Sequence, residues 1–139
     1  MVKIFLDTDA AYDLVSGRQP FYDQAEFVIP LAQSGKINLY ISAGSITNIF
    51  HFAYERDKIH DADERLFDIL KFCQVANTTQ EIVLASIHSL FSDKEDAYQY
   101  FTAFNVHANY FLTRNIKDYK SSSSLLPVLT PAQFAHLLS

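Results

Sequence analysis

The sequence contains few of the residues that interrupt regular structure or cross-link small proteins. Its 139 residues include only 3 glycines and 4 prolines, which excludes collagen-like and Pro/Gly-rich disordered classes. The single cysteine, Cys73, cannot form an intramolecular disulfide, and neither a CxxC pair nor a Cys/His zinc spacing is present. We therefore exclude a disulfide scaffold and a zinc finger, and expect a reducing, cytoplasmic location.

Long apolar runs and an excess of positive charge are also missing. No apolar run approaches the roughly 20 residues of a membrane helix, and the N-terminal apolar run reaches Asp7 too soon for a signal peptide. Lys and Arg total 11 against 16 Asp and Glu, for a net charge of -5. No global positive field can attract nucleic acid, so RNA binding would depend on local Lys/Arg patches or on metal ions held by acids.

The remaining composition is that of one globular domain over residues 1–139, with 49% hydrophobic and 19% charged residues. Short apolar runs predict five strands, over residues 2–7, 37–41, 74–76, 110–112 and 128–129. Helical spacing occurs between them, over residues 10–16, 20–34, 45–53, 62–72, 79–90 and 93–108, and again after Pro131. Strands alternating with helices predict an α/β fold with a mostly parallel sheet.

Apolar spacing also predicts the buried faces of two helices. The helix over 62–72 should direct Leu66, Phe67 and Leu70 inward. A capping-box pattern from Ser92 to Glu95 should open the helix that follows. The core face of this helix is predicted to carry Ala97, Phe101, Phe104 and Ala108.

Ligands of parallel α/β sheets bind at the carboxyl ends of the strands, so polar residues directly after the apolar runs are candidates for a site. The candidates at these positions are Asp7, Thr8 and Asp9 after the first strand, Ser42 and Asn48 after the second, and Thr113, Arg114, Asn115 and Asp118 after the fourth. Asp96 lies in the first turn of the helix that leads into the fourth strand. If these strands are neighbours, Asp7, Asp96 and Asn115 or Asp118 share one pocket.

Carboxylates that share a pocket repel one another unless a cation lies among them. Ligands that are all oxygen suit Mg²⁺ or Mn²⁺. Such an ion lowers the pKa of a bound water and stabilises the attacking and leaving oxygens of a phosphate ester. The pattern therefore predicts phosphate-ester hydrolysis. Structural explanations remain open for each residue: Asp7 as a helix cap, Asp96 as a charge at a helix N-terminus, Asp118 as a surface acid, and Ser45 and Asn48 as helix-start residues.

Longer motifs are more specific than this spacing. The segment Ile4–Asp9, with residues 12–14 and 18–22 behind it, resembles the opening of bacterial PIN-domain proteins, which typically have Leu-Asp-Thr-Asn here. The match continues in order through residues 42–49, 93–100, 110–119 and 127–134, and so covers nearly the whole chain. This resemblance implies a three-layer α/β/α sandwich around a five-stranded parallel sheet. It also implies a Mg²⁺- or Mn²⁺-dependent endoribonuclease similar to VapC-like toxins, which pair as homodimers and are inhibited by a small antitoxin protein.

The resemblance assigns roles to particular residues. It places the first and third family acids at Asp7 and Asp96, and the fourth acidic position at Asn115, with Asp118 as a nearby substitute. The expected metal ligands are Asp7, Asp9, Asp96 and Asp118. Thr8 and Thr113 would support them, with Thr113 bonding Asp7 or a metal-bound water. Arg114 and Lys117 would bind the RNA.

Two positions depart from the family pattern. The second family acid, a glutamate, is Asn48 here, whereas Asp9 replaces the usual asparagine and adds a carboxylate. A catalytically silent PIN fold that serves as an RNA- or protein-binding module is therefore an alternative, supported by Asn48 and Asn115. A haloacid dehalogenase-like phosphatase would use Asp7 as nucleophile and Asp9 as acid/base. However, Ala11 stands where that family has Thr or Val, and the chain lacks the length for a cap domain.

The early helices carry several aromatic side chains that could form a partner surface. We expect Tyr12, Phe21, Tyr22 and Phe27 to be candidates for this surface, with a place in the core as the alternative for Phe21 and Phe27.

Overall fold

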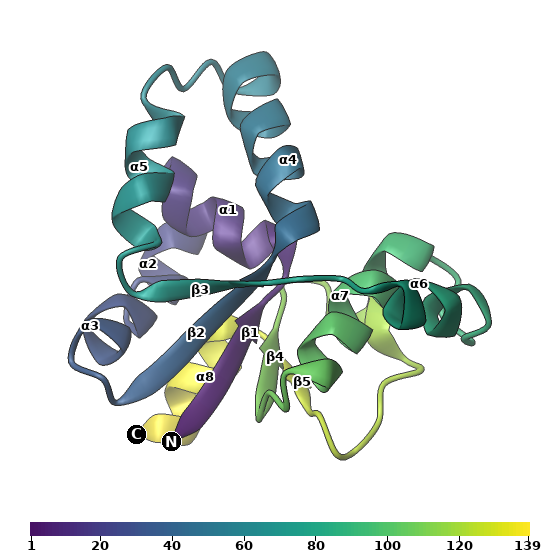
Figure 1. The fold of residues 1–139 in the computed structure, drawn as a ribbon. Coiled ribbons are helices and arrows are strands. Elements are labelled where there is room, and N and C mark those ends of the chain that lie inside the picture. The colour runs from purple at the N-terminus through teal and green to yellow at the C-terminus, as the bar shows by residue number, and fades with distance from the viewer.

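A computed structural model describes residues 1–139 and contains one five-stranded sheet (Figure 1). The strands are β1 (Val2–Leu6), β2 (Ile37–Ser42), β3 (Cys73–Ala76), β4 (Tyr110–Leu112) and β5 (Val128–Leu129). Their order in the sheet is β3-β2-β1-β4-β5, and every neighbouring pair is parallel. The carboxyl ends of β1, β2 and β4 therefore meet at one edge, as the strand pattern predicted.

Helices connect the strands. They are α1 (Thr8–Ser16), α2 (Phe21–Ala25), α3 (Val28–Gln33), α4 (Ala43–His51), α5 (Ala62–Ile69), α6 (Gln80–Ile87), α7 (Lys94–Asn105) and α8 (Pro131–Leu138). A π-helical segment, η1 (Phe52–Arg56), extends α4, and a 3-10 segment, η2 (Ile116–Tyr119), follows β4. In Figure 1, α4 and α5 form a pair that projects beyond the carboxyl edge of the sheet.

Successive side chains of the strands point to opposite faces of the sheet and enter two separate cores. Ile4 and Leu6 of β1 belong to a cluster of 21 buried residues with α1 to α5 and α8. Phe5, between them, belongs to a cluster of 10 with α7 and η2. The Phe5 ring stacks on Phe111 of β4 at 5.6 Å between centroids. Helices thus cover both faces, which confirms the predicted three-layer α/β/α sandwich.

Side-chain caps fix where several helices begin at the carboxyl edge. The Asp7 carboxylate accepts the Thr8 N–H at the start of α1, and Ser42 Oγ accepts the Ser45 N–H at the start of α4. Gly17 ends α1 with φ of 71°, a left-handed conformation that glycine adopts without strain. Because of these caps, the polar residues after β1 and β2 have fixed positions at the edge of the sheet.

Some local predictions were wrong at helix boundaries. The segment 20–34 is not one helix but two, α2 and α3, since Pro30 has no N–H to donate to the Glu26 carbonyl. Instead, the Ile29 N–H donates to that carbonyl in a tighter turn. The N-cap of α7 is Asp93 and not Ser92, because the Asp93 carboxylate accepts the N–H groups of two residues of the first turn.

Other errors concern which side chains are buried. Leu66 is buried as predicted, but Phe67 is 66% exposed and Leu70 is 36% exposed, because α5 packs against α1 through the face that carries Ala62, Leu66 and Ile69. For α7, the prediction is confirmed at Ala97, which is fully buried, and at Phe101, which packs against the smaller core, but Phe104 is 39% exposed. Ala108 is buried as well, although it lies beyond the end of α7. The buried face of α7 also contains Gln99, Tyr100, Thr102 and Ala103.

The aromatic residues of the early helices are less exposed than predicted. Tyr12 is 2% exposed and its hydroxyl donates to Asp57, so Tyr12 is not part of a surface. Phe27 packs against the larger core, with its ring centroid 6.0 Å from that of Phe134. Phe21 and Tyr22 are half-buried.

None of the helices combines the length and the apolar character that crossing a bilayer requires.

Candidate active site

A polar cavity of about 290 Å³ opens at the carboxyl edge of the sheet, between α1, α4 and α7. The cavity is formed by side chains that are far apart in the sequence, because β1 lies between β2 and β4. We call it the acidic pocket. Its lining residues are Asp7, Thr8, Asp9, Tyr12, Arg18, Asn48, Phe52, Arg56, Glu95, Asp96, Gln99, Arg114 and Asn115.

Asp7 and Asp96 are linked through one hydroxyl group. The Tyr119 hydroxyl is 2.8 Å from Asp7 Oδ2, to which it donates, and 3.3 Å from Asp96 Oδ1. Thr113 Oγ1 donates to the same Asp7 oxygen at 2.9 Å, as predicted, and Asp7 Oδ1 accepts the Thr8 N–H at 2.8 Å. Asp7 is therefore held by three donors at the end of β1, none of which is positively charged.

The surroundings of these two carboxyl groups disfavour their ionised forms. Burial, and next the negative charge of Asp9, raise the pKa of Asp7 to about 7. Burial, and next the charges of Asp93 and Asp118, raise the pKa of Asp96 to about 6. Positive charge placed between these groups would favour the ionised forms of both.

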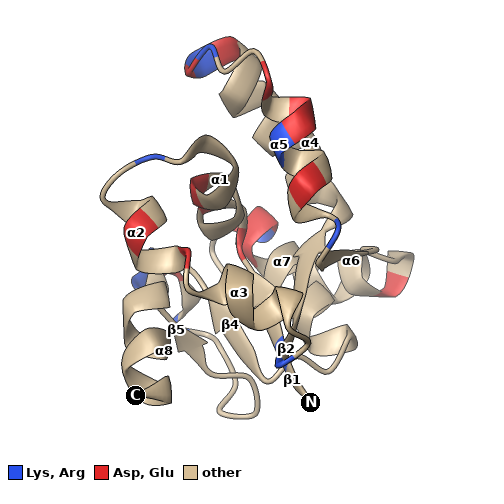
Figure 2. Cartoon of the chain, turned by 90° about the vertical axis from the view of Figure 1, so that its left-hand side faces the viewer, with Lys and Arg blue, Asp and Glu red and all other residues tan.

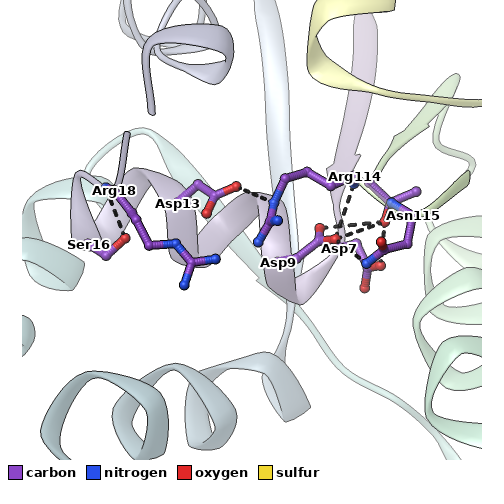
Figure 3. Close-up of polar contacts among 8 residues, drawn as sticks. Asp7, Asp9, Asp13, Ser16, Arg18, Arg114 and Asn115 are labelled. Atoms are coloured by element: carbon purple, nitrogen blue, oxygen red, sulfur yellow. Dashed lines mark hydrogen bonds and ion pairs between the residues drawn. The ribbon is translucent and has the colours of Figure 1, made fainter. Parts of the chain in front are cut away.

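Asp9 has a different set of partners, all from the segment after β4 (Figure 3). Its Oδ2 accepts the Arg114 N–H at 3.1 Å and the Asn115 Nδ2–H at 3.1 Å. Thr113 Oγ1 lies 3.3 Å from the same oxygen. Burial raises the pKa of Asp9, and the Arg114 charge opposes that shift. Asp9 thus joins the start of α1 to the turn after β4.

Asp13 holds the side chain of Arg114. Arg114 Nε donates to Asp13 Oδ2 at 2.8 Å, and Asp13 is 1% exposed (Figure 3). The guanidinium carbon lies 4.0 Å from the centroid of the Phe21 ring, a cation–π contact. Burial nevertheless raises the pKa of Asp13 to about 6. Arg114, predicted to bind RNA, is therefore already paired with a buried carboxyl group.

Two more arginines line the acidic pocket, and they differ in their partners. Arg56 forms a salt bridge with Asp57 at 3.1 Å and lies 4.6 Å above the Phe52 ring. Arg18 forms no salt bridge, and its Nε is buried without a hydrogen-bond partner. In Figure 3 its guanidinium makes none of the marked contacts. Arg18 is thus the one arginine of the pocket whose charge is not neutralised by an ion pair.

The side of the pocket toward α4 is neutral except for Glu95. Asn48 is half-buried there and lines the pocket, as predicted for the position of the second family acid. Gln99 Nε2 donates to Thr8 Oγ1 at 3.3 Å, and Thr8 Oγ1 lies 2.7 Å from Ser45 Oγ. Glu95, in the first turn of α7, is exposed and lines the same pocket.

The structure thus brings most of the predicted residues together, but not all of them. Asp118 and Lys117 line a separate cavity beside Phe91 and Lys120. Both are exposed, because the 3-10 turn of η2 directs Tyr119 inward and Asp118 outward.

The strand-end rule missed several residues of the site, among them Asp13, Arg18, Glu95, Gln99 and Tyr119. Glu95 was within reach of sequence reasoning, since it precedes Asp96 in the same helical turn. The others lie one to three turns from a strand end, and only packing brings them to the site.

The residues fit a hard divalent cation held partly by water. No three His, Cys, Asp or Glu side chains are placed to hold a metal ion together. Asp7 and Asp96, both within hydrogen-bond distance of Tyr119, offer two carboxylates, and Mg²⁺ is commonly held by one or two carboxylates with water and substrate phosphate.

A parallel α/β/α sandwich with paired carboxyl groups at the carboxyl edge of its sheet is the architecture of a class of small domains with an acidic site. Comparison with known proteins narrows that class. The PIN domain family matches residues 3–117, and the chain therefore belongs to the PIN domain family.

Solved structures share the fold. The chain is similar to one in the structure of VapBC2 from Rickettsia felis bound to a DNA fragment from its promoter, with a TM-score of 0.66 and 15% identity, over 93% of this chain and 98% of that one. A toxin–antitoxin complex from Klebsiella pneumoniae gives a TM-score of 0.65 and 22% identity, over 92% and 97%. A search of curated proteins gave no match.

Proposed function

We propose that the protein is a Mg²⁺- or Mn²⁺-dependent endoribonuclease that hydrolyses phosphodiester bonds of RNA. The observation that carries this proposal is the pair formed by Asp7 and Asp96 at the carboxyl edge of a PIN fold. The two carboxyl groups are linked through Tyr119 and have no basic partner. A carboxyl pair that is costly to ionise without positive charge is suited to bind a divalent cation.

Different side chains of the pocket would have different roles in hydrolysis. Asp7 and Asp96 would hold the cation, which when bound supplies an activated water and stabilises charge on the phosphate. Thr113 and Tyr119 orient Asp7 through hydrogen bonds of 2.9 and 2.8 Å. The unpaired guanidinium of Arg18 would bind a phosphate oxygen of the RNA. Arg114 keeps Asp13 and the turn after β4 in place.

Phosphate binding at this pocket would depend on single arginines. In the view of Figure 2, Lys/Arg and Asp/Glu residues alternate along the α4–α5 pair and do not form a basic face. The net charge of -5 is consistent with this view. A substrate would therefore be attracted by the cation and by Arg18 in the pocket, and weakly by the rest of the surface.

RNA cleavage by wild-type protein with millimolar Mg²⁺ or Mn²⁺ tests the proposal. We expect Asp96→Asn to reduce the cleavage rate by a hundredfold or more, the usual size for loss of one electrostatic group that stabilises a transition state (~10²–10³). Asp63→Asn, an exposed acid on α5, is the matched control and should cleave as wild type does. Equal rates of RNA cleavage by Asp96→Asn and wild type would contradict the proposed nuclease activity.

The same assay separates the alternatives. A silent PIN module, which Asn48 and Asn115 favour, would bind RNA without cutting it. A phosphatase would hydrolyse p-nitrophenyl phosphate and leave RNA intact. Cleavage of RNA alone, dependent on the cation, supports the ribonuclease.

We include in the proposal a role as the toxin of a toxin–antitoxin pair, with a homodimer as the active form. Its support is the fold shared with two toxin–antitoxin complexes. An apolar cavity of about 360 Å³ between α1, α3 and α5, lined by Leu14, Ile29 and Ile69 among others, could accept an antitoxin side chain. Co-expression with the product of a small adjacent gene should inhibit RNA cleavage.

The homodimer has its own test. Light scattering at high protein concentration should show a dimer, and a monomer would contradict the proposed homodimer.

A further inference from the structure

A second cavity, of about 520 Å³, lies beside the acidic pocket and has a different chemical character. We call it the neutral cavity. It is lined by Ser42, Asn48, Asn77, Thr78, Tyr98 and Gln99, with Glu95 as its only charged residue. The two cavities share Asn48, Glu95 and Gln99 as lining residues, so they adjoin one another. The neutral cavity extends the carboxyl edge of the sheet to β3, which ends directly before Asn77.

Gln99 has an unused hydrogen-bond acceptor where the cavities join. Its side chain is 8% exposed, and its Nε2 donates to Thr8 Oγ1 at 3.3 Å. Its Oε1 is buried and has no partner. A buried acceptor without a partner is costly, so such a group calls for an explanation, of which a water or ligand beside it is one.

A chain of hydroxyl groups fixes the position of this acceptor. Thr8 Oγ1, which holds Gln99, lies 2.7 Å from Ser45 Oγ, which lies 3.1 Å from Ser42 Oγ. Ser45 is fully buried, and Ser42 caps α4. Gln99 is thus held by the same residues that begin α1 and α4, and it lines both cavities.

The lining of the neutral cavity selects a class of ligand. With no Lys or Arg and with Glu95 at its boundary, it is unsuited to a phosphate group. Amide side chains recognise the donor and acceptor edges of nucleobases, and aromatic side chains such as Tyr98 can stack on their faces. Its volume lies within the ~300–1,000 Å³ range of small-molecule sites.

We propose that the neutral cavity binds one nucleobase of the substrate, adjacent to the scissile phosphate, through hydrogen bonds to the amide side chains that line the cavity, with Gln99 where the two cavities adjoin. Asn77 and Asn48 would contact the remaining polar edge of the base, and Tyr98 would contact its face. This inference rests on the proposed ribonuclease function, since the acidic pocket would hold the phosphate that joins this base to the next nucleotide. The cavity would then give the enzyme a nucleotide preference on one side of the cut.

Cleavage of a random-sequence RNA, with sequencing of the cut ends, tests this proposal. Wild type should show a preference at one position next to the cut. Asn77→Ala and Gln99→Leu should each reduce that preference by about tenfold, the effect of losing one hydrogen bond to a base edge. Asn105→Ala, an equally exposed asparagine at the far end of α7, is the control and should keep it. An unchanged preference in both variants, or no preference in wild type, would overturn the subsite.

Binding without cleavage separates the subsite from the nuclease activity. In EDTA, fluorescein-labelled RNA pentanucleotides that differ in one central base should bind wild type with affinities that differ by at least fivefold. Asn77→Ala should bind all of them equally. If wild type shows this base preference but cuts no RNA with Mg²⁺ or Mn²⁺, the nuclease is wrong and the subsite stands. If wild type cuts RNA but neither binds nor cuts with a base preference, the subsite is wrong and the nuclease stands. Equal thermal unfolding of the variants and wild type would show that the mutations act on binding alone.

Discussion

The acidic pocket contains two pairs of aspartates that differ in how their charge is balanced. Asp9 and Asp13 contact Arg114, through its backbone N–H and its Nε respectively, and both bonds join α1 to the turn after β4. Asp7 and Asp96 share only the neutral hydroxyl of Tyr119. Burial raises the pKa of all four, but a basic partner opposes that shift directly on the first pair alone.

This difference indicates separate roles for acids that look alike in the sequence. A carboxyl group that lies against a half-buried arginine such as Arg114 has its charge balanced within the protein, so it gains less from a further ligand. A carboxyl pair without such a partner gains most from an external cation. We call Asp9 and Asp13 the compensated pair and Asp7 and Asp96 the uncompensated pair. The additional acid at Asp9, which departs from the usual asparagine, belongs to the compensated pair. We therefore expect Asp9 to support the geometry of the site and not to replace the carboxylate missing at Asn48.

Replacing the paired Arg114 and the unpaired Arg18 in turn should separate an effect on stability from an effect on activity. The largest effect that we expect is the loss of stability in the Arg114 variant. Arg114→Gln leaves Asp13 buried at 1% exposure without its partner, and we expect a loss of about 3 kcal/mol in the free energy of unfolding. Arg18→Gln breaks no ion pair and should leave stability nearly unchanged while lowering kcat/KM for RNA about tenfold. Urea unfolding and RNA cleavage measure the two effects. If Arg18→Gln destabilises the protein more than Arg114→Gln does, the structural role assigned to Arg114 and the substrate-binding role assigned to Arg18 are wrong.

The pH dependence of stability should show the cost of ionising the buried carboxyl groups of the site. The pKa of Asp7 is raised to about 7, and those of Asp13 and Asp96 to about 6, from an ordinary value of 3.8. The folded state then binds these protons more tightly than the unfolded state does. Each group therefore contributes stability that is present below about pH 4 and is lost as pH rises through the folded pKa. We expect stability without divalent cations to fall between about pH 4 and pH 7, by at most about 1.4 kcal/mol per pH unit for each group.

Mn²⁺ should reverse this loss near pH 7, because it binds the ionised pair. Stabilisation by a ligand that binds the native state alone reaches about 2.7 kcal/mol at 100 times its Kd. Thermal unfolding with and without Mn²⁺ measures both effects. Asp7→Asn should flatten the pH slope and lose most of the Mn²⁺ shift, whereas Asp63→Asn should do neither. A wild-type melting temperature that Mn²⁺ leaves unchanged would contradict the shared cation site.

The hydroxyl that links Asp7 and Asp96 should have a smaller effect. Tyr119→Phe removes hydrogen bonds of 2.8 and 3.3 Å and should lower the free energy of unfolding by about 1–2 kcal/mol. Tyr110→Phe on β4 is the matched control: Tyr110 is half-buried and its hydroxyl makes no hydrogen bond in the structure. Chemical denaturation compares the two variants. Equal losses would show that Tyr119 contributes only through its ring, which packs 4.8 Å from that of Phe111.

The compensated and uncompensated pairs also show how far sequence reasoning reaches. The strands and the position of Asp7 follow from apolar runs that end in acids, because the carboxyl edge of a parallel sheet collects such residues. Tyr119 and Arg18 follow from no such rule. Tyr119 enters the site because a 3-10 turn directs it inward, and Arg18 because the chain turns back at Gly17. Both depend on tertiary packing that local patterns do not encode.

The same limit explains the errors in burial. Phe67 and Phe104 have the spacing of core residues, but each lies on the side of its helix that faces solvent. The buried side of α7 combines the small residues Ala97 and Ala103 with the large ring of Tyr100. Periodicity predicts that a helix has a buried face, but the neighbouring layer decides which face it is.

The smallest expected effect concerns Asn48, an uncharged residue that lines the acidic pocket together with Asp7 and Asp96. Asn48→Glu would place a carboxylate across the pocket from Asp7 and Asp96, the pair that has no basic partner. With Mg²⁺ or Mn²⁺ present, a third carboxylate should strengthen retention of the cation, and RNA cleavage should equal or exceed that of wild type by up to about tenfold, or ~1.4 kcal/mol off the barrier. Without a divalent cation, the added charge should instead lower the melting temperature, because it increases repulsion in the pocket. Asn48→Gln, which adds the same length without charge, is the control and should show neither change. If Asn48→Glu loses activity and gains no Mn²⁺-dependent stability, Asn48 acts as a neutral contact, and the pocket functions with the acids it already has.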